Sequence, residues 1–415
     1  GAANMSGTYS GLQARIKQKN PAAKYIHCCA HALNLVINDS VSNIPEIRTF
    51  FDNVQSLYVF FKTISRWALL TKSAMLQKTL KKVCPTRWTS RNQAVDALRC
   101  GYFDIMKVLT FLTLEGKDQE EINQAKSLLK YFEQFSTVIL IVIESVLLET
   151  MDIISKKLQS TEEDLEHATK MLLNLKTKIN KLRNEWQTVK ADATKLCLQW
   201  KVVPHFIDSR TKKKTRMFDE VQVDDPIKDN EKRFRVEVFN RSLDIITTQL
   251  TERFEAVTHI TSSFQCLKPS FLVGASDEEI LESSKILILN YQDDVSLNLG
   301  PQLVRLKTCF LSHVEKLKSI RDLADTLIVR AQVGSSFPDV VNACLIFLTL
   351  PVTTASAERS FLKLKLIKNY LRSTMSQERL SALATISIER SRARHINLDD
   401  TITQFASMKS RKKIS

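Results

Sequence analysis

The segment "MDIISKKLQSTEEDLEHATKMLLNLKTKINKLRNEWQTVKADATKLCL", residues 151–198, decides the fold class. It contains no Gly or Pro, and its apolar residues recur at alternating three- and four-residue steps that only Thr161 interrupts. These positions are Met151, Ile154, Leu158, Leu165, Ala168, Leu172, Leu175, Ile179, Leu182, Trp186, Val189, Ala193 and Leu196. The pattern predicts a long coiled-coil-like arm. Pairing with another chain and packing within this one are both open, and neighbouring helical segments favour the second.

The composition extends the helical prediction to most of the chain. Its 415 residues include 8 Gly, 9 Pro and 44% hydrophobic residues, and such scarcity of helix breakers is typical of long helices. A strongly apolar helical face follows Pro45, whereas 205–232 is polar without periodicity and is expected to be a linker. The apolar run 138–148 is too short for a membrane span and contains Glu144, so we expect a buried helix and no membrane. The predicted fold class is mainly α.

The net charge points to an anionic partner. Lys and Arg number 60 against 45 Asp and Glu, which gives a charge of +15 and favours DNA contact. The alternative is a lysine-rich surface that only keeps the protein in solution. The 8 cysteines are scattered rather than dense, which favours a reducing compartment over a disulfide scaffold.

Two short motifs carry candidate binding residues. In "CCAHALNL", Cys28 and His31 have the spacing of half a zinc site, but no second pair is near in sequence. The alternative is a buried thiol and a hydrogen-bonded histidine at the end of a strand over 23–31. In "CPTRWTSR" (84–91), Arg87 and Arg91 suit phosphates, and Trp88 offers a plane for an unpaired base or fills a hydrophobic gap.

The third motif is "TTASAERSFLKLKLIKNYLRS", residues 353–373. Its one acidic residue, Glu358, precedes Arg359 and opens a basic helix with apolar periodicity. We expect Ser356 to cap this helix, which places Glu358 in the first turn, where a carboxylate favours the helix dipole. The other interpretation is a catalytic carboxylate that binds metal.

Taken in order, these motifs resemble the hAT superfamily of DNA transposases, closest to its zinc-finger MYM-type-like, transposase-derived branch. The resemblance is carried by four stretches: "GAANMSG" (1–7), "CCAHALNLVINDS" (28–40), "PTRWTSR" (85–91) and "LPVTTASAERSFLKLKLIKNYLRSTMSQERLSALATISIE" (350–389). It implies a ribonuclease-H-like α/β core interrupted by a large helical insertion domain. In such a core an Asp, Asp, Glu set holds two Mg²⁺ ions and cuts DNA.

The resemblance also assigns roles to single residues. Glu358 matches the family's glutamate, Trp88 the tryptophan that stacks on a flipped base, and Cys28 with His31 the pair near transposon-end DNA. The flanking basic residues are expected at DNA as well: Arg87, Arg91 and Arg359.

The match departs from the family at the other two carboxylates. In the family, "GAANMSG" directly follows the second catalytic aspartate, so both aspartates lie outside these residues and the chain is expected to be a fragment. One carboxylate does not hold two Mg²⁺ ions, so we expect no metal, no cofactor and no strand cleavage from this fragment. Leu362 stands where the family usually has Ser.

The family assigns self-association to the C-terminal region, and it places its members in the nucleus. The apolar positions at helical spacing there are Phe361, Leu364, Ile367, Leu371, Leu380, Leu383 and Ile386. A homodimer or higher oligomer is therefore expected. The predicted divisions are a partial core (1–100), an insertion domain (101–330), the dimerisation region (331–392) and a basic tail (393–415).

Three functional interpretations follow. The first is a transposase-derived protein that dimerises and associates with DNA without a complete catalytic set. The second is the C-terminal part of an active cut-and-paste transposase, and the third is a helical scaffold without a nucleic-acid role.

Overall fold

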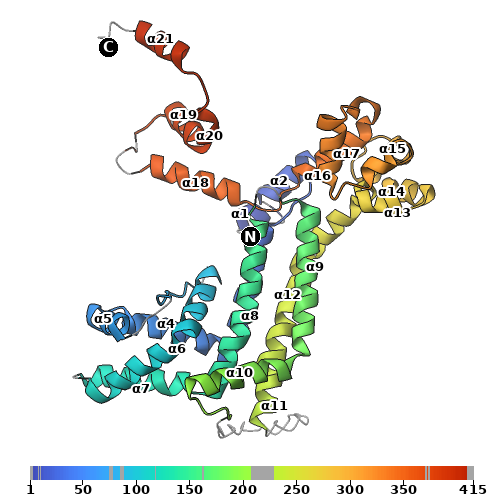
Figure 1. The fold of residues 1–415 in the computed structure, drawn as a ribbon. Helices are drawn as coiled ribbons and strands as arrows, with labels where there is room; N and C mark the ends of the chain where they lie inside the picture. The colour runs from blue at the N-terminus through green and yellow to red at the C-terminus, as the bar shows by residue number, and fades with distance from the viewer. Residues whose placement is uncertain are drawn as a thin grey trace. The chain divides into compact units, whose positions relative to one another are not determined.

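The computed structural model divides the chain into two compact units, Gly1–Val352 and Thr353–Ser415 (Figure 1). It describes residues 3–7, 9, 11–73, 78–84, 88–116, 118–160, 163–206, 229–369, 372 and 374–408. Within these residues the secondary structure is helical and contains no strand. The prediction of a mainly α fold is confirmed.

In the first unit, the described helices that end before residue 151 are α1 (Ala3–Ser6), α2 (Leu12–Lys19), α3 (Cys29–Asn43), α4 (Pro45–Phe61), α5 (Ile64–Ser73), α6 (Trp88–Glu115) and α7 (Gln119–Phe132). The remaining ones are α8 (Phe135–Leu158), α9 (Leu165–Arg183), α10 (Trp186–Trp200), α11 (Asn230–Phe234), the π-helix η1 (Arg235–Asn240), α12 (Arg241–Ser263), η2 (Gln265–Leu267), α13 (Pro269–Gly274), α14 (Asp277–Asn290), α15 (Leu299–Val314), α16 (Ile320–Asp325), η3 (Thr326–Arg330), η4 (Gly334–Ser336) and α17 (Pro338–Thr349).

The strand predicted over 23–31 is wrong, and the described residues of 1–100 contain no ribonuclease-H-like sheet. Residues 23–28 are irregular, and Cys29 already begins α3. Ile26 and Cys28 are buried on either side of the less buried His27, so the two-residue period of a strand is present. A strand also needs a neighbour for its backbone groups, and no such neighbour lies beside these residues in the described part of the chain.

Helix α4 forms where the sequence predicts it. Pro45 occupies its first position, where a missing backbone N–H costs no hydrogen bond. The face that the sequence marks as apolar is buried, by Ile47, Phe50, Phe51, Val54, Leu57, Phe60 and Phe61.

The segment 151–198 is not one helix but the end of α8, all of α9 and most of α10. Asp164 caps α9 by accepting a 2.8 Å hydrogen bond from the His167 N–H, and a second break falls at 184–185. Helix α9 packs on α12 and α10 packs on α8, so most of the apolar positions are buried within the chain (Figure 1). The predicted continuous arm is therefore wrong, whereas the preference for packing within the chain is confirmed.

Helix α8 carries the apolar run 138–148 through the core of the first unit. Nearly all of its residues are buried, and Glu144 is only 4% exposed. No helix in the described part of the chain is long and apolar enough to cross a membrane. The run is therefore a core helix, as the sequence predicts.

A buried carboxylate ties together the last third of the first unit. Asp339, near the start of α17, accepts hydrogen bonds from the Ser296 N–H (2.8 Å), the Ser296 hydroxyl (2.9 Å) and the Gln302 Nε2 amide (2.7 Å). The Gln302 carbonyl oxygen in turn accepts from the Asp339 N–H at 3.0 Å. The loop before α15, α15 itself and α17 are thus joined by one satisfied polar cluster.

The second unit contains α18 (Ala355–Ile367), α19 (Gln377–Ile388), α20 (Arg390–Ala393) and α21 (Asp399–Ser407). Helix α18 packs against α19. The Lys363 ammonium of α18 donates to the Ser387 carbonyl at 2.9 Å and to the Ile388 carbonyl at 3.2 Å. A cation there satisfies carbonyls that the end of α19 leaves without helical partners.

The boundary between the two units follows residue 352, whereas the sequence suggests boundaries after 100, 330 and 392. Helix α6 runs without a break through residue 100, because its apolar periodicity continues there. Residue 330 ends η3 within the first unit, and residue 392 lies inside α20 of the second unit.

Candidate functional site

Glu358 lies in the first turn of α18, as the sequence predicts. Its side chain is exposed, and its Oε1 accepts a 2.9 Å hydrogen bond from the Thr354 hydroxyl. The expected cap at Ser356 is wrong, because the helix already begins at Ala355 and Thr354 is the residue before it. Its neighbour Arg359 is exposed, and its Nη2 donates weakly to the Ser356 hydroxyl at 3.5 Å.

The described residues contain no group of three or more His, Cys, Asp or Glu side chains that could hold a metal ion. Two aspartates of the first unit are instead engaged with cations. Asp39 accepts from Arg253 Nη2, and Asp96 from the Lys78 ammonium, each at 2.5 Å. These carboxylates act as ion-pair partners in the fold.

Cys28 and His31 lie at the start of α3, with Cys28 buried and His31 exposed. The His31 ring is 5.2 Å from the His27 ring, measured between centroids. Burial lowers the pKa of His27, and nearby positive charge, including His31 and Arg253, lowers it further. The neighbouring Cys29 is fully buried, and burial raises the pKa of its thiol to about 12. The surroundings are thus basic, which suits a neutral imidazole.

Arg91 is buried, with 6% of its surface exposed, which is unlike an exposed phosphate ligand. Its Nη1 donates to the Asn38 Oδ1 of α3 at 2.7 Å, and its guanidinium lies 5.2 Å from the centre of the Phe51 ring of α4. Both interactions engage the Arg91 guanidinium, which is the group that would bind a phosphate. The burial of Arg91 therefore argues against the predicted DNA contact. Arg87 and the side chain of Trp88 lie outside the described residues, although Trp88 begins α6.

Glu144 is a charged group of the core that the sequence does not connect with Arg91. Burial raises the pKa of Glu144 to about 7, and the charge of Arg91 opposes this shift. Burial also lowers the pKa of Arg91, and the negative charge of Glu144 opposes that shift. The sequence does show one carboxylate, Glu144, within an eleven-residue apolar run. The residues next to it do not indicate that Arg91 lies nearby in the fold.

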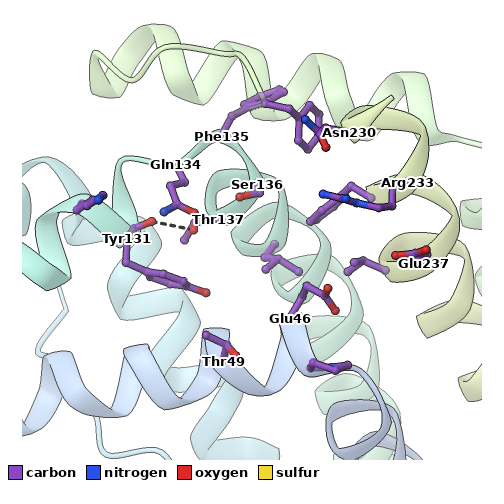
Figure 2. A pocket seen from close by; sticks show the side chains of 16 residues that line it. Glu46, Thr49, Tyr131, Gln134, Phe135, Ser136, Thr137, Asn230, Arg233 and Glu237 are labelled. Carbon is purple, nitrogen blue, oxygen red and sulfur yellow. Dashed lines mark hydrogen bonds between the residues drawn. The ribbon is translucent and has the colours of Figure 1, made fainter. Parts of the chain in front are cut away.

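A cavity of about 490 Å³ opens between the start of α4, the junction of α7 and α8, and α11 with η1 (Figure 2). One wall is aromatic, where the Phe206 ring lies 5.1 Å from that of Phe135 and 5.5 Å from that of Phe234, between centroids. Two carboxylates, Glu46 and Glu237, also line the cavity. Sequence reasoning missed this cavity because its walls come from segments far apart along the chain.

The predicted dimerisation residues differ in exposure. Phe361 is 69% exposed and Ile386 is also exposed, whereas Leu364, Ile367 and Leu383 are half-buried and Leu380 is buried. Leu371 lies outside the described residues. Further exposed apolar side chains, which the sequence does not single out, are Leu362, Leu366, Ile396, Leu398, Ile402, Phe405 and Met408. The second unit thus combines a small internal interface between α18 and α19 with several exposed apolar side chains.

Part of the C-terminal region is similar to a known protein family. Residues 311–391 match the hAT family C-terminal dimerisation region, beginning at 311 where the sequence analysis has 331. A mouse protein, the 52 kDa repressor of the inhibitor of the protein kinase, is 23% identical over 406 residues. That alignment covers 91% of this chain and 51% of the mouse protein, so the chain spans about half the length of this relative. Residues 311–391 are thus similar to the C-terminal dimerisation region of the hAT family, and most of the chain is distantly similar to the mouse repressor; neither match concerns the MYM-type zinc finger.

Proposed function

We propose that this chain is a transposase-derived, nuclear protein that self-associates through its C-terminal helices and associates with DNA without cutting it. The observation that carries self-association is the exposed apolar surface of the second unit. On α18, Phe361, Leu362 and Leu366 are 69%, 64% and 78% exposed, within the stretch that matches the dimerisation region.

The energetics favour burial of this surface against a second copy. Leu362 and Leu366 are four residues apart and share one face of α18, with Phe361 beside them. Moving one such side chain out of water contributes about 1.5–3 kcal/mol. In a two-fold symmetric homodimer, each copy presents the same face of α18 to the other, so the exposed apolar side chains of both copies are buried together.

Light scattering after size exclusion tests self-association. The full chain is expected to be a dimer or larger at micromolar concentration, and the double variant Leu362→Asp/Leu366→Asp a monomer. The matched control is Leu198→Asp/Leu289→Asp, which alters two equally apolar residues, each 71% exposed, on α10 and α14. A monomeric wild-type chain, or a control that dissociates as readily as the α18 variant, contradicts the proposal.

DNA association is supported by the net charge of +15 and by the similarity of residues 311–391 to a region of the hAT family. Lys and Arg that neutralise phosphates release counterions, so the affinity should fall steeply as salt rises. Fluorescence anisotropy with a labelled duplex measures this dependence. A chain that fails to bind at low salt, or binds equally at all salt concentrations, is a helical scaffold without this role.

The absence of cleavage is proposed from the position of Glu358. Its carboxylate is engaged with Thr354 at the start of α18, a helix-terminal role that needs no metal. The name of the mouse relative describes a repressor rather than a nuclease, which supports a role without strand cutting. Incubation of the purified chain with supercoiled plasmid and Mg²⁺ should leave the plasmid intact. Nicking that is abolished by Glu358→Gln would instead indicate an active transposase fragment.

A further inference from the structure

A second cavity, of about 440 Å³, lies between α2, residues 23–25 and α12. Its lining includes Lys17, Lys24, the Tyr25 ring and the half-buried Ile260 of α12. The Tyr25 side chain is 41% exposed, so part of its ring is open to a ligand. The volume falls within the range of pockets that take small organic molecules, about 300–1,000 Å³.

The charged residues that line this cavity are all basic. Its lining contains two lysines and no carboxylate, unlike the cavity of Figure 2, which has Glu46 and Glu237. Neither lysine forms an ion pair within the described part of the chain, and the Lys24 ammonium donates only to the neutral Asn290 Oδ1, at 3.3 Å. Two ammonium groups without carboxylates favour an anionic ligand.

The backbone beside the cavity also lacks partners. Ala23 donates its N–H to Asn20, and Cys29 donates its own to Val352. Between them, the backbone of 24–27 takes part in no hydrogen bond with any residue that the structure describes. Backbone N–H and C=O groups are obligatory hydrogen-bonding groups, so those of Lys24 and Tyr25, the two exposed residues of this segment that line the cavity, can bind polar ligand atoms directly.

From these three observations we propose that the cavity binds one nucleotide of single-stranded DNA. The base stacks on the Tyr25 ring over the apolar floor, and the flanking phosphates bind the Lys17 and Lys24 ammonium groups. This site lies outside residues 311–391, the region of the family match. The inference rests on the proposed association with DNA and adds a place and a strand preference to it.

Anisotropy with a short fluorescein-labelled oligothymidylate tests the site in the full chain. Tyr25→Ala should weaken binding about 5- to 140-fold, because stacking of one base is removed, whereas Tyr25→Phe should keep the affinity. The matched control is Phe103→Ala, which removes another exposed aromatic ring, on α6. Equal affinities for Tyr25→Ala and Phe103→Ala overturn the stacking role.

The lysines are tested by the salt dependence. Lys17→Gln/Lys24→Gln should reduce the slope of log affinity against log salt by about 0.7 for each phosphate that is no longer neutralised. Lys107→Gln/Lys126→Gln, two exposed lysines of α6 and α7, makes the same change in net charge and should leave the slope nearly unchanged. A slope that falls equally in both double variants overturns the site.

Photo-crosslinking gives a readout that does not depend on variants. An oligonucleotide that carries bromodeoxyuridine should crosslink to the peptide that contains Tyr25, and crosslinks confined to other peptides refute the assignment. If the wild-type chain binds neither single strands nor duplex at low salt, the proposed DNA association fails together with the site. If it binds DNA but Tyr25 and both lysines are dispensable, only the site fails.

Discussion

The buried Glu144 makes the stability of the first unit depend on pH. Its pKa rises from an ordinary value of 4.5 to about 7 in the folded chain, chiefly through burial. A carboxyl group with a raised folded pKa stabilises the fold fully below about pH 4.5, and that stability disappears as the pH rises through about 7. The difference of 2.5 units (7 − 4.5) corresponds to about 3 kcal/mol at 1.36 kcal/mol per unit.

The substitution Glu144→Gln removes this ionisation while it keeps the shape of the side chain. Urea unfolding from about pH 5 to about pH 8 should therefore show the wild type losing about 2.5 kcal/mol relative to the variant, because a small part of the effect is already lost at pH 5. Glu149→Gln, an exposed carboxylate on the same helix, is the control and should show no such trend. A difference between wild type and Glu144→Gln that stays constant with pH, or that grows in favour of the wild type at high pH, refutes the reasoning.

Three further outcomes follow from single side chains. Asp339→Ala should destabilise the chain by about 2–4 kcal/mol in urea, because Gln302 and its neighbours lose a buried acceptor, and Asp339→Asn should cost less. Glu358→Gln should leave both the unfolding midpoint and the oligomeric mass unchanged, since its only described bond is on the surface; dissociation of the dimer would contradict this. Trp186→Phe should cost about 2 kcal/mol, because the buried indole N–H donates to the Glu231 carboxylate at 3.2 Å; a cost near zero would rule out that bond.

The candidate sites show where sequence reasoning ends. The sequence places Glu358 in the correct first turn, although it assigns the cap to Ser356 and the helix is preceded by Thr354. The sequence also predicts that Arg91 contacts phosphates, whereas its guanidinium contacts Asn38 and Phe51 of other helices. Nothing adjacent to Arg91 in the sequence marks it as buried, so only the packed structure could reveal its role.

The sequence by itself determined the helical class, the start of α4 at Pro45 and the similarity of the C-terminal helices to the hAT dimerisation region. Each depends on patterns within a few residues or one short stretch, because helix hydrogen bonds and caps are local. The tertiary structure decided the rest. Residues 23–28 lack a neighbouring strand, the heptad pattern divides between α8, α9 and α10, and Glu144 meets Arg91 only after folding. Local periodicity does not encode interactions between distant segments. Those interactions determine whether a strand finds a partner, where a long helix breaks and which groups surround a buried charge.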